Sequence, residues 1–421
     1  MTLRRSAAAL AAAAVLGTVA APAASAAPAP TPVAIPSGLY GKGDPTYDGV
    51  FRQSLALLAQ RTVGVRPATK AVDWLVGQQC DNGGFPAFRA DASKACDAKV
   101  MVDTNATAAA VQALGALGGQ DAAVRKAVDW LKSVQNKDGG WPYSPGTPSD
   151  ANSTSIVIGA LLSAGLKPKD AMAKDGKSPV QTLLTFQADC EGKPDDQGAF
   201  AFQADKAGKL YPNADATAAV VTAAADKSMV VAPGKANEEL KPAADCAAGM
   251  TSPEAAADGG SAYLSGLLDK NGQHLMSAMP GAEDKPDFGN TADAAVALAA
   301  AGHRDAAVKP AEWLAKNAAS WAQQTGPAAY AQLIFAAHAT GMDPRSFGGT
   351  DLVAQLNATG PAPQAAQGAG DAKKDGAQRD EAQKDDGGGS SATWWIVGIA
   401  FVASMGAGFL ISGRNKKNQQ L

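Results

Sequence analysis

The hexapeptide Lys70-Ala-Val-Asp-Trp-Leu75 decides the fold, because it recurs letter for letter as Lys126-Ala-Val-Asp-Trp-Leu131, 56 residues further along the chain. Each copy leads into a glycine pair, an aromatic residue and a proline, at Gly83-Gly-Phe-Pro86 and Gly139-Gly-Trp-Pro142. Recurrence of one pattern at such a spacing is the signature of a repeat architecture. Fainter copies lie at residues 180–200, 267–275 and 309–314.

Each unit continues with a short polar stretch and then an alanine-rich apolar run. Asp, Asn, Ser and Thr are preferred at helix N-caps, because their oxygens accept hydrogen bonds from the free N–H groups there. The runs are apolar almost all round, so we expect buried helices. The hexapeptide helices are amphipathic and should lie outside them. The expected inner helices are residues 50–60, 108–117, 155–164, 218–225, 294–301 and 328–339.

Six inner helices inside amphipathic outer ones predict an all-α fold, an (α/α)6 toroid of helix-pair repeats over residues 48–360. Closing the ring removes the exposed end faces that an open solenoid must cap. An open helical solenoid remains the structural alternative. In the fourth unit, we expect His274 to stand in place of the stacking aromatic residue.

The glutamine-to-aromatic feature at Gln79–Phe85 and Gln135–Trp141 resembles the repeat of squalene/hopene cyclases and of protein prenyltransferase β-subunits. The resemblance implies a toroid, a fold also used by complement-like thioester domains and by cobalamin-binding proteins. It does not extend to the motifs that carry activity in these families. The globular region has no Asp-x-Asp-Asp acid, no Asp-x-Cys zinc motif and no Cys-Gly-Glu-Gln thioester sequence. We therefore expect no cofactor and no metal, and we favour a non-catalytic protein.

Polar residues at the starts of the inner helices are the candidate ligand contacts. In a toroid these helix starts line one mouth of the central cavity, where N–H groups and side-chain amides can bind a ligand. Aromatic residues nearby would supply flat apolar walls. The alternative is that the polar residues only cap their helices. The candidates are Asp103, Asn105, Asp150, Asn152, Asn213, Asp215, Asn290, Asp293, Tyr143, Tyr211 and Phe288.

The sequence thus predicts a surface protein that binds an extracellular small molecule or polymer in its cavity and passes it to a membrane transporter. The resemblance to cobalamin binders suggests a corrinoid-like ligand. A divergent terpene-cyclase-like or carbohydrate-active enzyme is one alternative, and a structural or adhesive module is another. A wide aromatic-lined cavity would favour binding, a deep aspartate-bearing cavity would favour an enzyme, and a centre filled by Ala and Leu would favour a scaffold. With 37 Lys and Arg against 40 Asp and Glu, the chain is not expected to bind nucleic acid.

The amino-terminal end predicts export. Residues 1–26 combine an arginine pair, a run of small apolar residues and the cleavage sequence Ala24-Ser25-Ala26, which is typical of a secretory signal. A plain membrane helix is the alternative. Residues 27–47 are interpreted as an extension that precedes the toroid.

The carboxyl-terminal end predicts a membrane anchor. Residues 393–412 are uncharged, and about 20 residues cross a bilayer core of about 30 Å. The basic residues within 413–421 indicate a cytoplasmic tail. A cell-wall sorting signal is the alternative. Residues 361–392 form a polar linker that cannot bury a core. The alanine-rich signal and the basic tail are typical of a bacterial protein.

The four cysteines are expected to pair, because an exported compartment is oxidising. Proximity along the chain suggests Cys80 with Cys96 and Cys190 with Cys246, although two other pairings stay open.

Overall fold

The computed structural model describes most of the region predicted to be globular. The signal at 1–26, the linker from residue 366 onward, the predicted membrane helix at 393–412, the tail at 413–421, and Cys190 and Cys246 lie outside the described residues. Within them, no helix is both long enough and apolar enough to cross a membrane. The described residues are 33–97, 99–188, 194–234, 237–241, 249–277 and 285–365.

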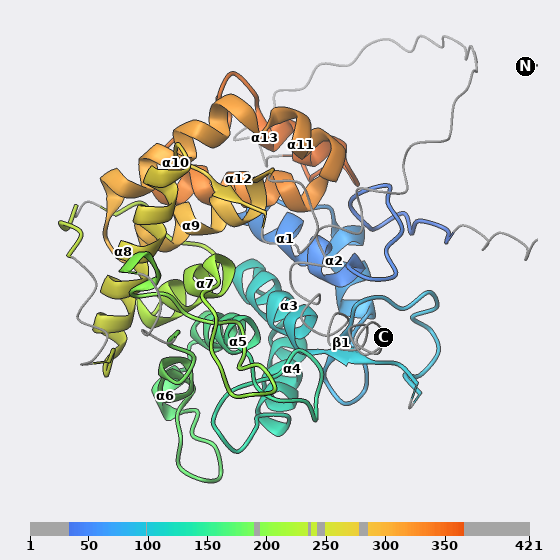
Figure 1. Ribbon diagram of the computed structural model, residues 1–421. Helices are drawn as coiled ribbons and strands as arrows, with labels where there is room; N and C mark the ends of the chain where they lie inside the picture. The colour runs from blue at the N-terminus through green and yellow to red at the C-terminus, as the bar shows by residue number, and fades with distance from the viewer. Residues whose placement is uncertain are drawn as a thin grey trace, which may run out of the picture. The chain divides into compact units, whose positions relative to one another are not determined.

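Six inner helices form a ring in these residues. Each contacts the next one along the chain, and the last contacts the first (Figure 1). This closed cycle is that of an all-α toroid and not of an open solenoid. The helices begin up to six residues earlier than predicted and end within two residues of the prediction. They are α1 (Gly49–Thr62), α3 (Thr104–Leu117), α5 (Ala151–Ser163), α7 (Ala214–Ala224), α9 (Phe288–Ala300) and α12 (Pro327–Thr340).

Outer helices pack against this ring. The second hexapeptide lies in α4, where Ala127 and Leu131 are buried while Lys126 and Asp129 are exposed, as its amphipathic pattern predicts. The outer helices are α2 (Thr69–Gly77), α4 (Asp121–Ser133), α6 (Pro179–Leu184), α8 (Pro253–Lys270), α10 (Arg304–Asn317), α11 (Ala319–Thr325) and α13 (Leu352–Ala358), with 3-10 helices η1 (Pro168–Asp170) and η2 (Pro194–Asp196). Two antiparallel pairs of short strands join β1 (Phe85–Pro86) to β2 (Val102–Asp103) and β3 (Leu275–Met276) to β4 (Pro286–Asp287).

The glycine pair of each repeat fits a tight turn beside the next unit. Gly83 has a φ of +96°, which side chains rarely adopt. A Cβ at Gly83 would collide with the carbonyl oxygen of Lys126 on α4. The glycine is therefore required both by backbone conformation and by the close approach of two repeats.

A threonine four residues after each helix cap fastens this turn to the next inner helix. Its hydroxyl accepts the backbone N–H of the residue that follows the turn, over 2.8 to 3.0 Å. One buried side chain thus joins the two halves of each repeat. The pairs are Thr107 with Phe85, Thr154 with Trp141, Thr217 with Phe200, and Thr291 with Leu275.

The fourth pair corrects one prediction. The Leu275 N–H donates to the Thr291 hydroxyl and Leu275 is buried, so Leu275 and not His274 takes the aromatic position. The ring of His274 instead stacks on Trp313 of α10, with centroids 4.5 Å apart. The imidazole ring of His274 therefore packs on an aromatic side chain of the outer helix, while the aliphatic side chain of Leu275 packs in the core.

The two ends of the described chain meet where the ring closes. The Tyr40 hydroxyl donates to the carbonyl of Pro361 over 2.8 Å, and the Gly41 N–H donates to the carbonyl of Thr359 over 2.9 Å. Gln60 of α1 also donates to Asn357 of α13 over 2.7 Å. These bonds join the first inner helix to the last part of the toroid.

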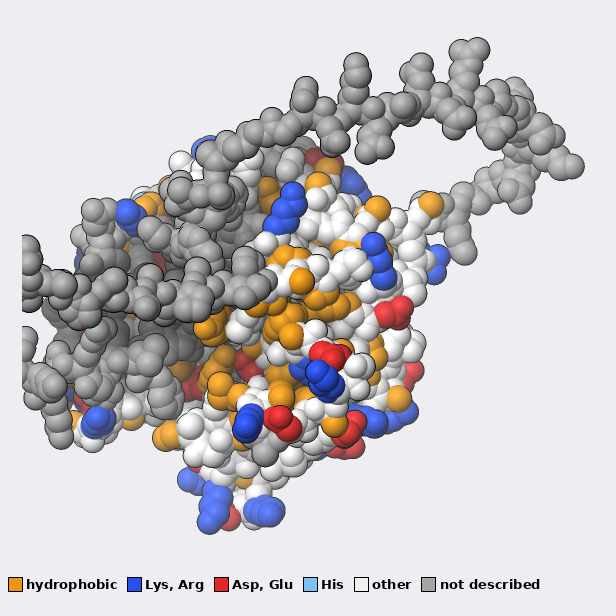
Figure 2. All heavy atoms as spheres, turned by 90° about the vertical axis from the view of Figure 1, so that its right-hand side faces the viewer, with side chains coloured by type: hydrophobic (Ala, Val, Ile, Leu, Met, Phe, Trp, Pro, Cys, Tyr) orange, Lys and Arg blue, Asp and Glu red, His pale blue; other side chains and the backbone are white. Residues whose placement is uncertain are grey.

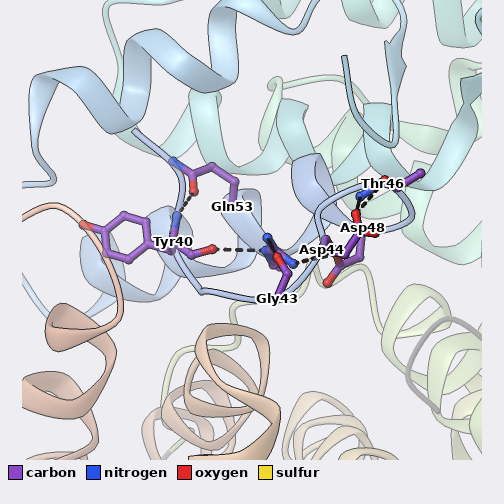
Figure 3. Close-up of polar contacts among 7 residues, drawn as sticks. Tyr40, Gly43, Asp44, Thr46, Asp48 and Gln53 are labelled. Atoms are coloured by element: carbon purple, nitrogen blue, oxygen red, sulfur yellow. Dashed lines mark hydrogen bonds and ion pairs between the residues drawn. The ribbon is translucent and has the colours of Figure 1, made fainter. Parts of the chain in front are cut away.

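Arg52, on α1, holds the segment that leads into this junction. Its guanidinium donates to the carbonyls of Tyr40 and Gly43 over 3.1 and 2.8 Å, and it forms an ion pair with Asp48 at 2.9 Å (Figure 3). Gln53 accepts the N–H of Tyr40 over 2.8 Å. The described part of the predicted extension is thus fixed to the ring.

The Cys80–Cys96 disulfide is confirmed, and it closes a loop between α2 and β2.

Candidate functional site

A cavity of about 140 Å³ lies at the centre of the ring, and all six inner helices contribute to its lining. Polar and apolar residues share its walls. The lining residues are Phe51, Leu55, Asn105, Gln112, Asn152, Ser155, Ile156, Gly159, Asp215, Ala218, Ala219, Thr222, Lys227, Ser228, Met229, Asp293, Val296, Gln332 and Phe335.

The loop after α7 lies across one end of this cavity. The Met229 N–H donates to Oε1 of Gln112 on α3 over 3.0 Å. A Cβ on Gly159 of α5 would lie 3.3 Å from the Cα of Ser228, so a glycine lets the loop approach closely. The loop therefore contacts two inner helices on the side where Lys227 also lines the cavity.

Two carboxyl groups stand at the opposite end, among the helix starts. Asn152, at the start of α5, donates from Nδ2 to Asp215 over 2.8 Å. Gln332 of α12 donates from Nε2 to Asp293 of α9 over 3.2 Å. Each carboxyl thus has an amide partner on a neighbouring helix.

Burial raises the pKa of both carboxyl groups toward neutrality. The pKa of Asp215 rises to about 7, because burial disfavours its charge and Asp287 and Asp150 repel it. Burial raises the pKa of Asp293 to about 8, with repulsion from Asp215 adding to the effect. Burial also raises the pKa of Asp150 to about 6. The cluster therefore exchanges protons near neutral pH.

Three polar atoms of the lining lack a hydrogen-bond partner among the described residues. They are Oδ1 of Asn152, Oε1 of Gln332 and Oγ of Ser155. These side chains are only 8, 7 and 6 % exposed. An unsatisfied buried polar group costs about 1–3 kcal/mol, so these atoms need a partner other than the described side chains.

The structure separates the predicted polar candidates into two groups. Asn105, Asn152, Asp215 and Asp293 line the cavity. The others fasten helix starts, because Asp103, Asp150 and Asn213 accept backbone N–H groups over 2.7 to 2.8 Å, as N-caps do.

The start of α9 differs from the prediction. Its N-cap is Asp287, which accepts the N–H of Asn290 over 3.0 Å. Asn290 also donates from Nδ2 to Asp287 over 2.9 Å. The helix therefore begins six residues earlier than the expected 294, and Asp293 lies inside it, one turn beyond its start.

The three predicted aromatic walls lie outside the cavity lining. The hydroxyl of Tyr143 bonds to Asp103, and burial raises the pKa of that phenol. Tyr211 is 55 % exposed, with Nζ of Lys209 lying 5.2 Å from the ring centroid. Phe288 belongs to α9 and stacks on Trp313 and Trp321 at 5.2 and 5.5 Å. Phe51 and Phe335 are the aromatic residues that do line the cavity.

Several lining residues were missed by the sequence analysis. Gln112 and Gln332 lie within the largely apolar inner helices α3 and α12, away from the polar residues at the helix ends. A glutamine inside such a helix is a signal that could have been used, because a buried amide needs a polar partner.

The outer surface is mixed. On the face shown in Figure 2, apolar side chains gather toward the middle, with charged side chains around them. Within the described ranges, no group of three or more His, Cys, Asp or Glu is placed to hold a metal ion.

Comparison with known proteins gives only partial matches, and no family model matches the chain. The squalene–hopene cyclase of Alicyclobacillus acidocaldarius is 31 % identical over 109 residues, which cover 23 % of this chain and 17 % of that one. The enzyme of Bradyrhizobium diazoefficiens is 38 % identical over 78 residues, 16 % of this chain and 11 % of that one. The chain thus spans less than a fifth of these relatives. The matches support the toroid superfamily at most.

Solved structures are more distant. A glycosidase aligns with a TM-score of 0.42 at 14 % identity, covering 72 % of this chain and 92 % of that one. A sugar epimerase from a ruminal bacterium aligns with a TM-score of 0.38 at 15 % identity, covering 66 % and 80 %. At these values, the alignments carry no conclusion about substrate or activity.

Proposed function

We propose that this protein binds a small molecule in the cavity at the centre of its helical ring. The observation that carries the proposal is a group of polar atoms on Asn152, Gln332 and Ser155 that have no partner in the described part of the chain. These residues line the cavity together with Asp215 and Asp293. A ligand that hydrogen-bonds to these atoms offsets the free-energy cost of burying them. A scaffold would gain stability by filling the same space with apolar side chains.

The volume limits the ligand. Pockets for drug-sized molecules are about 300–1,000 Å³, whereas this cavity measures about 140 Å³. A ligand of a few heavy atoms fits such a space, and a corrinoid macrocycle does not. A polymer would enter only through a small side group or an end. We therefore propose a small ligand and not the corrinoid that the resemblance suggested.

The setting of this activity is also a proposal, and it rests on the sequence. Residues 1–26 would direct export, and residues 393–412 would anchor the chain with its toroid outside the cell. The linker at 361–392 would let the toroid deliver its ligand to a membrane transporter. Nucleic acid is not a proposed partner.

An acid–base enzyme is the second candidate, and one observation favours it. Burial raises the pKa of Asp215 to about 7 and that of Asp293 to about 8, which suits general acid or base catalysis near neutral pH. This pair of carboxyl groups suits a carbohydrate-active enzyme better than it suits a polyene cyclase. Among the described residues, only Phe51 and Phe335 contribute aromatic faces to the lining, whereas carbocations need many.

Thermal melting of the full chain in detergent, against a panel of amines, polyols, monosaccharides and short isoprenoid alcohols, tests the binding function. A ligand at a hundredfold excess over its Kd stabilises the fold by about 2.7 kcal/mol. We expect a shift for one class, lost in Gln332→Leu and kept in Asp129→Asn on the exposed face of α4. A flat panel contradicts the proposal. Mass spectrometry of the bound compounds reveals any chemical change and so separates the enzyme from the binder.

A further inference from the structure

The charges and hydrogen-bonding atoms of the cavity point to one chemical class of ligand. We infer that the cavity takes a small organic cation, with an ammonium group held between Asp215 and Asp293 and an apolar body lying along the inner helices. This inference rests on the proposed binding function and specifies its ligand.

The first argument is charge. Asp150 and Asp287 lie close enough to raise the pKa of Asp215, and Asp215 and Asp287 likewise raise the pKa of Asp293. The four ion pairs found among the described residues involve none of them. Lys227 is the only lysine or arginine of the described cavity lining, and it stands at the other end. A bound ammonium would relieve the repulsion between the carboxyl groups, whereas an anion would add to it.

The second argument is the direction of the hydrogen bonds. Asn152 and Gln332 each use a side-chain N–H on a carboxyl group, and the carbonyl oxygen of each amide is buried without a donor among the described residues. Carboxylates and amide oxygens are acceptors, and the site therefore needs donors. An ammonium carries three donors and no acceptor. A ligand without donors would leave the two amide oxygens as unsatisfied as they are now.

The third argument is the rest of the lining. Phe51, Phe335, Ile156 and Val296 offer an apolar wall beside the polar end. Burial of a short hydrocarbon contributes about 25 cal/mol per Å², and aromatic faces also attract a cation. The ammonium group of a small aliphatic amine therefore suits the polar part of the cavity, and its hydrocarbon chain suits the apolar wall. Such an amine is also small enough for the cavity volume of about 140 Å³.

Calorimetric titration of the full chain in detergent tests this inference. It is done at about pH 8, because an alkylammonium, like a lysine side chain, is still charged at that pH. The probes are n-pentylamine, its neutral counterpart 1-pentanol and its anionic counterpart pentanoate. We expect the amine to bind at least about tenfold more tightly than either, which corresponds to about 1.4 kcal/mol. A blocked lysine derivative is the fourth probe. Binding equal to that of pentylamine would also support ammonium recognition and would identify a peptide side chain as its source.

Variants sharpen the test. Asp215→Asn and Asp293→Asn should weaken amine binding at least about tenfold, and Asp129→Asn should leave it unchanged. A melting curve for each variant shows that it is folded. Equal binding of pentylamine and pentanol would overturn the inference while leaving a small-molecule cavity in place. Failure of the amine to bind would also overturn it, and the wider ligand panel would then decide the proposed function separately.

Discussion

The side-chain amide of Asn152 donates a hydrogen bond of 2.8 Å to the carboxyl group of Asp215 on the next inner helix. Both residues occupy the second position of their helices, α5 and α7. Asn105 occupies the same position in α3 and also lines the cavity. The repeat therefore places equivalent helix positions side by side around the cavity. At this position α3 and α5 carry an amide, whereas α7 carries the carboxyl group of Asp215.

The first prediction concerns the stability of the carboxyl pair. The folded protein holds Asp215 and Asp293 at pKa values of about 7 and 8, whereas an unfolded aspartate has a pKa of about 4. Their contribution to stability is thus fully present below about pH 4 and is lost as the pH rises through about 7 to 8. We expect Asp293→Asn to raise the free energy of unfolding at about pH 8 by an amount on the order of 1 kcal/mol.

Urea denaturation at about pH 8 and pH 4 measures this difference. The gain from Asp293→Asn should disappear at the lower pH, where the native carboxyl group is already protonated. Asp129→Asn, on the exposed face of α4, is the matched control and should change little at either pH. A less stable Asp293→Asn protein at the higher pH would show that the carboxyl group is not destabilising there.

The second prediction concerns protons released on binding. An ammonium between Asp215 and Asp293 favours their ionised forms, so binding lowers their pKa values and expels protons near neutral pH. Amine affinity should rise between about pH 6 and pH 8 as the two groups ionise, given pKa values of about 7 and 8. Calorimetry in two buffers with different ionisation enthalpies counts the released protons. Amine binding without any proton release would contradict a role for this pair.

The third prediction separates helix caps from ligand contacts. Asp103 accepts the Ala106 N–H over 2.8 Å and does not line the cavity. Asp103→Ala should cost about 1–2 kcal/mol of stability, whereas Asp103→Asn keeps an acceptor and should cost only a few tenths. Both variants should bind ligand as the parent does. A ligand titration of each variant, with a separate melting curve, checks this. A selective loss of binding in Asp103→Asn would show that Asp103 contributes to the ligand site.

The sequence predicted what depends on local rules. Glycine pairs, cap residues and apolar runs each act within a few residues, so the inner helices and the caps Asp103, Asp150 and Asn213 could be placed. The cavity depends on which side chains the ring brings together. Gln332 meets Asp293 from 39 residues away, and Asn152 meets Asp215 from 63. No local pattern shows which face of an apolar helix points to the centre, so the sequence did not identify Phe51 and Phe335 as the aromatic residues of the lining.

The fourth prediction concerns the threonine that fastens each repeat. Thr154 accepts the Trp141 N–H over 3.0 Å in the buried core. Thr154→Val keeps the shape but leaves that N–H unsatisfied, so we expect a loss of about 1–3 kcal/mol. Thr340→Val is the control, because the equally buried Thr340 hydroxyl only donates to carbonyls of its own helix. Equal losses for the two variants in urea denaturation would argue against the fastening role.

The last prediction concerns the closure of the ring. The Tyr40 side chain is fully buried, donates to the carbonyl of Pro361 over 2.8 Å and accepts from Nε2 of Gln60 over 3.0 Å. Tyr40→Phe keeps the packed ring but removes both bonds, so we expect a loss of about 1–3 kcal/mol.

Tyr47→Phe, at a position that is 70 % exposed, should cost almost nothing. Because the Tyr40 bonds connect residues 321 positions apart, their loss should also expose the junction of α1 and α13 to exchange. Hydrogen exchange should therefore rise first in residues 357–361 and in the preceding loop at 38–44, ahead of the inner helices. A uniform rise over the whole ring would mean that the closure has no stability separate from the rest of the toroid.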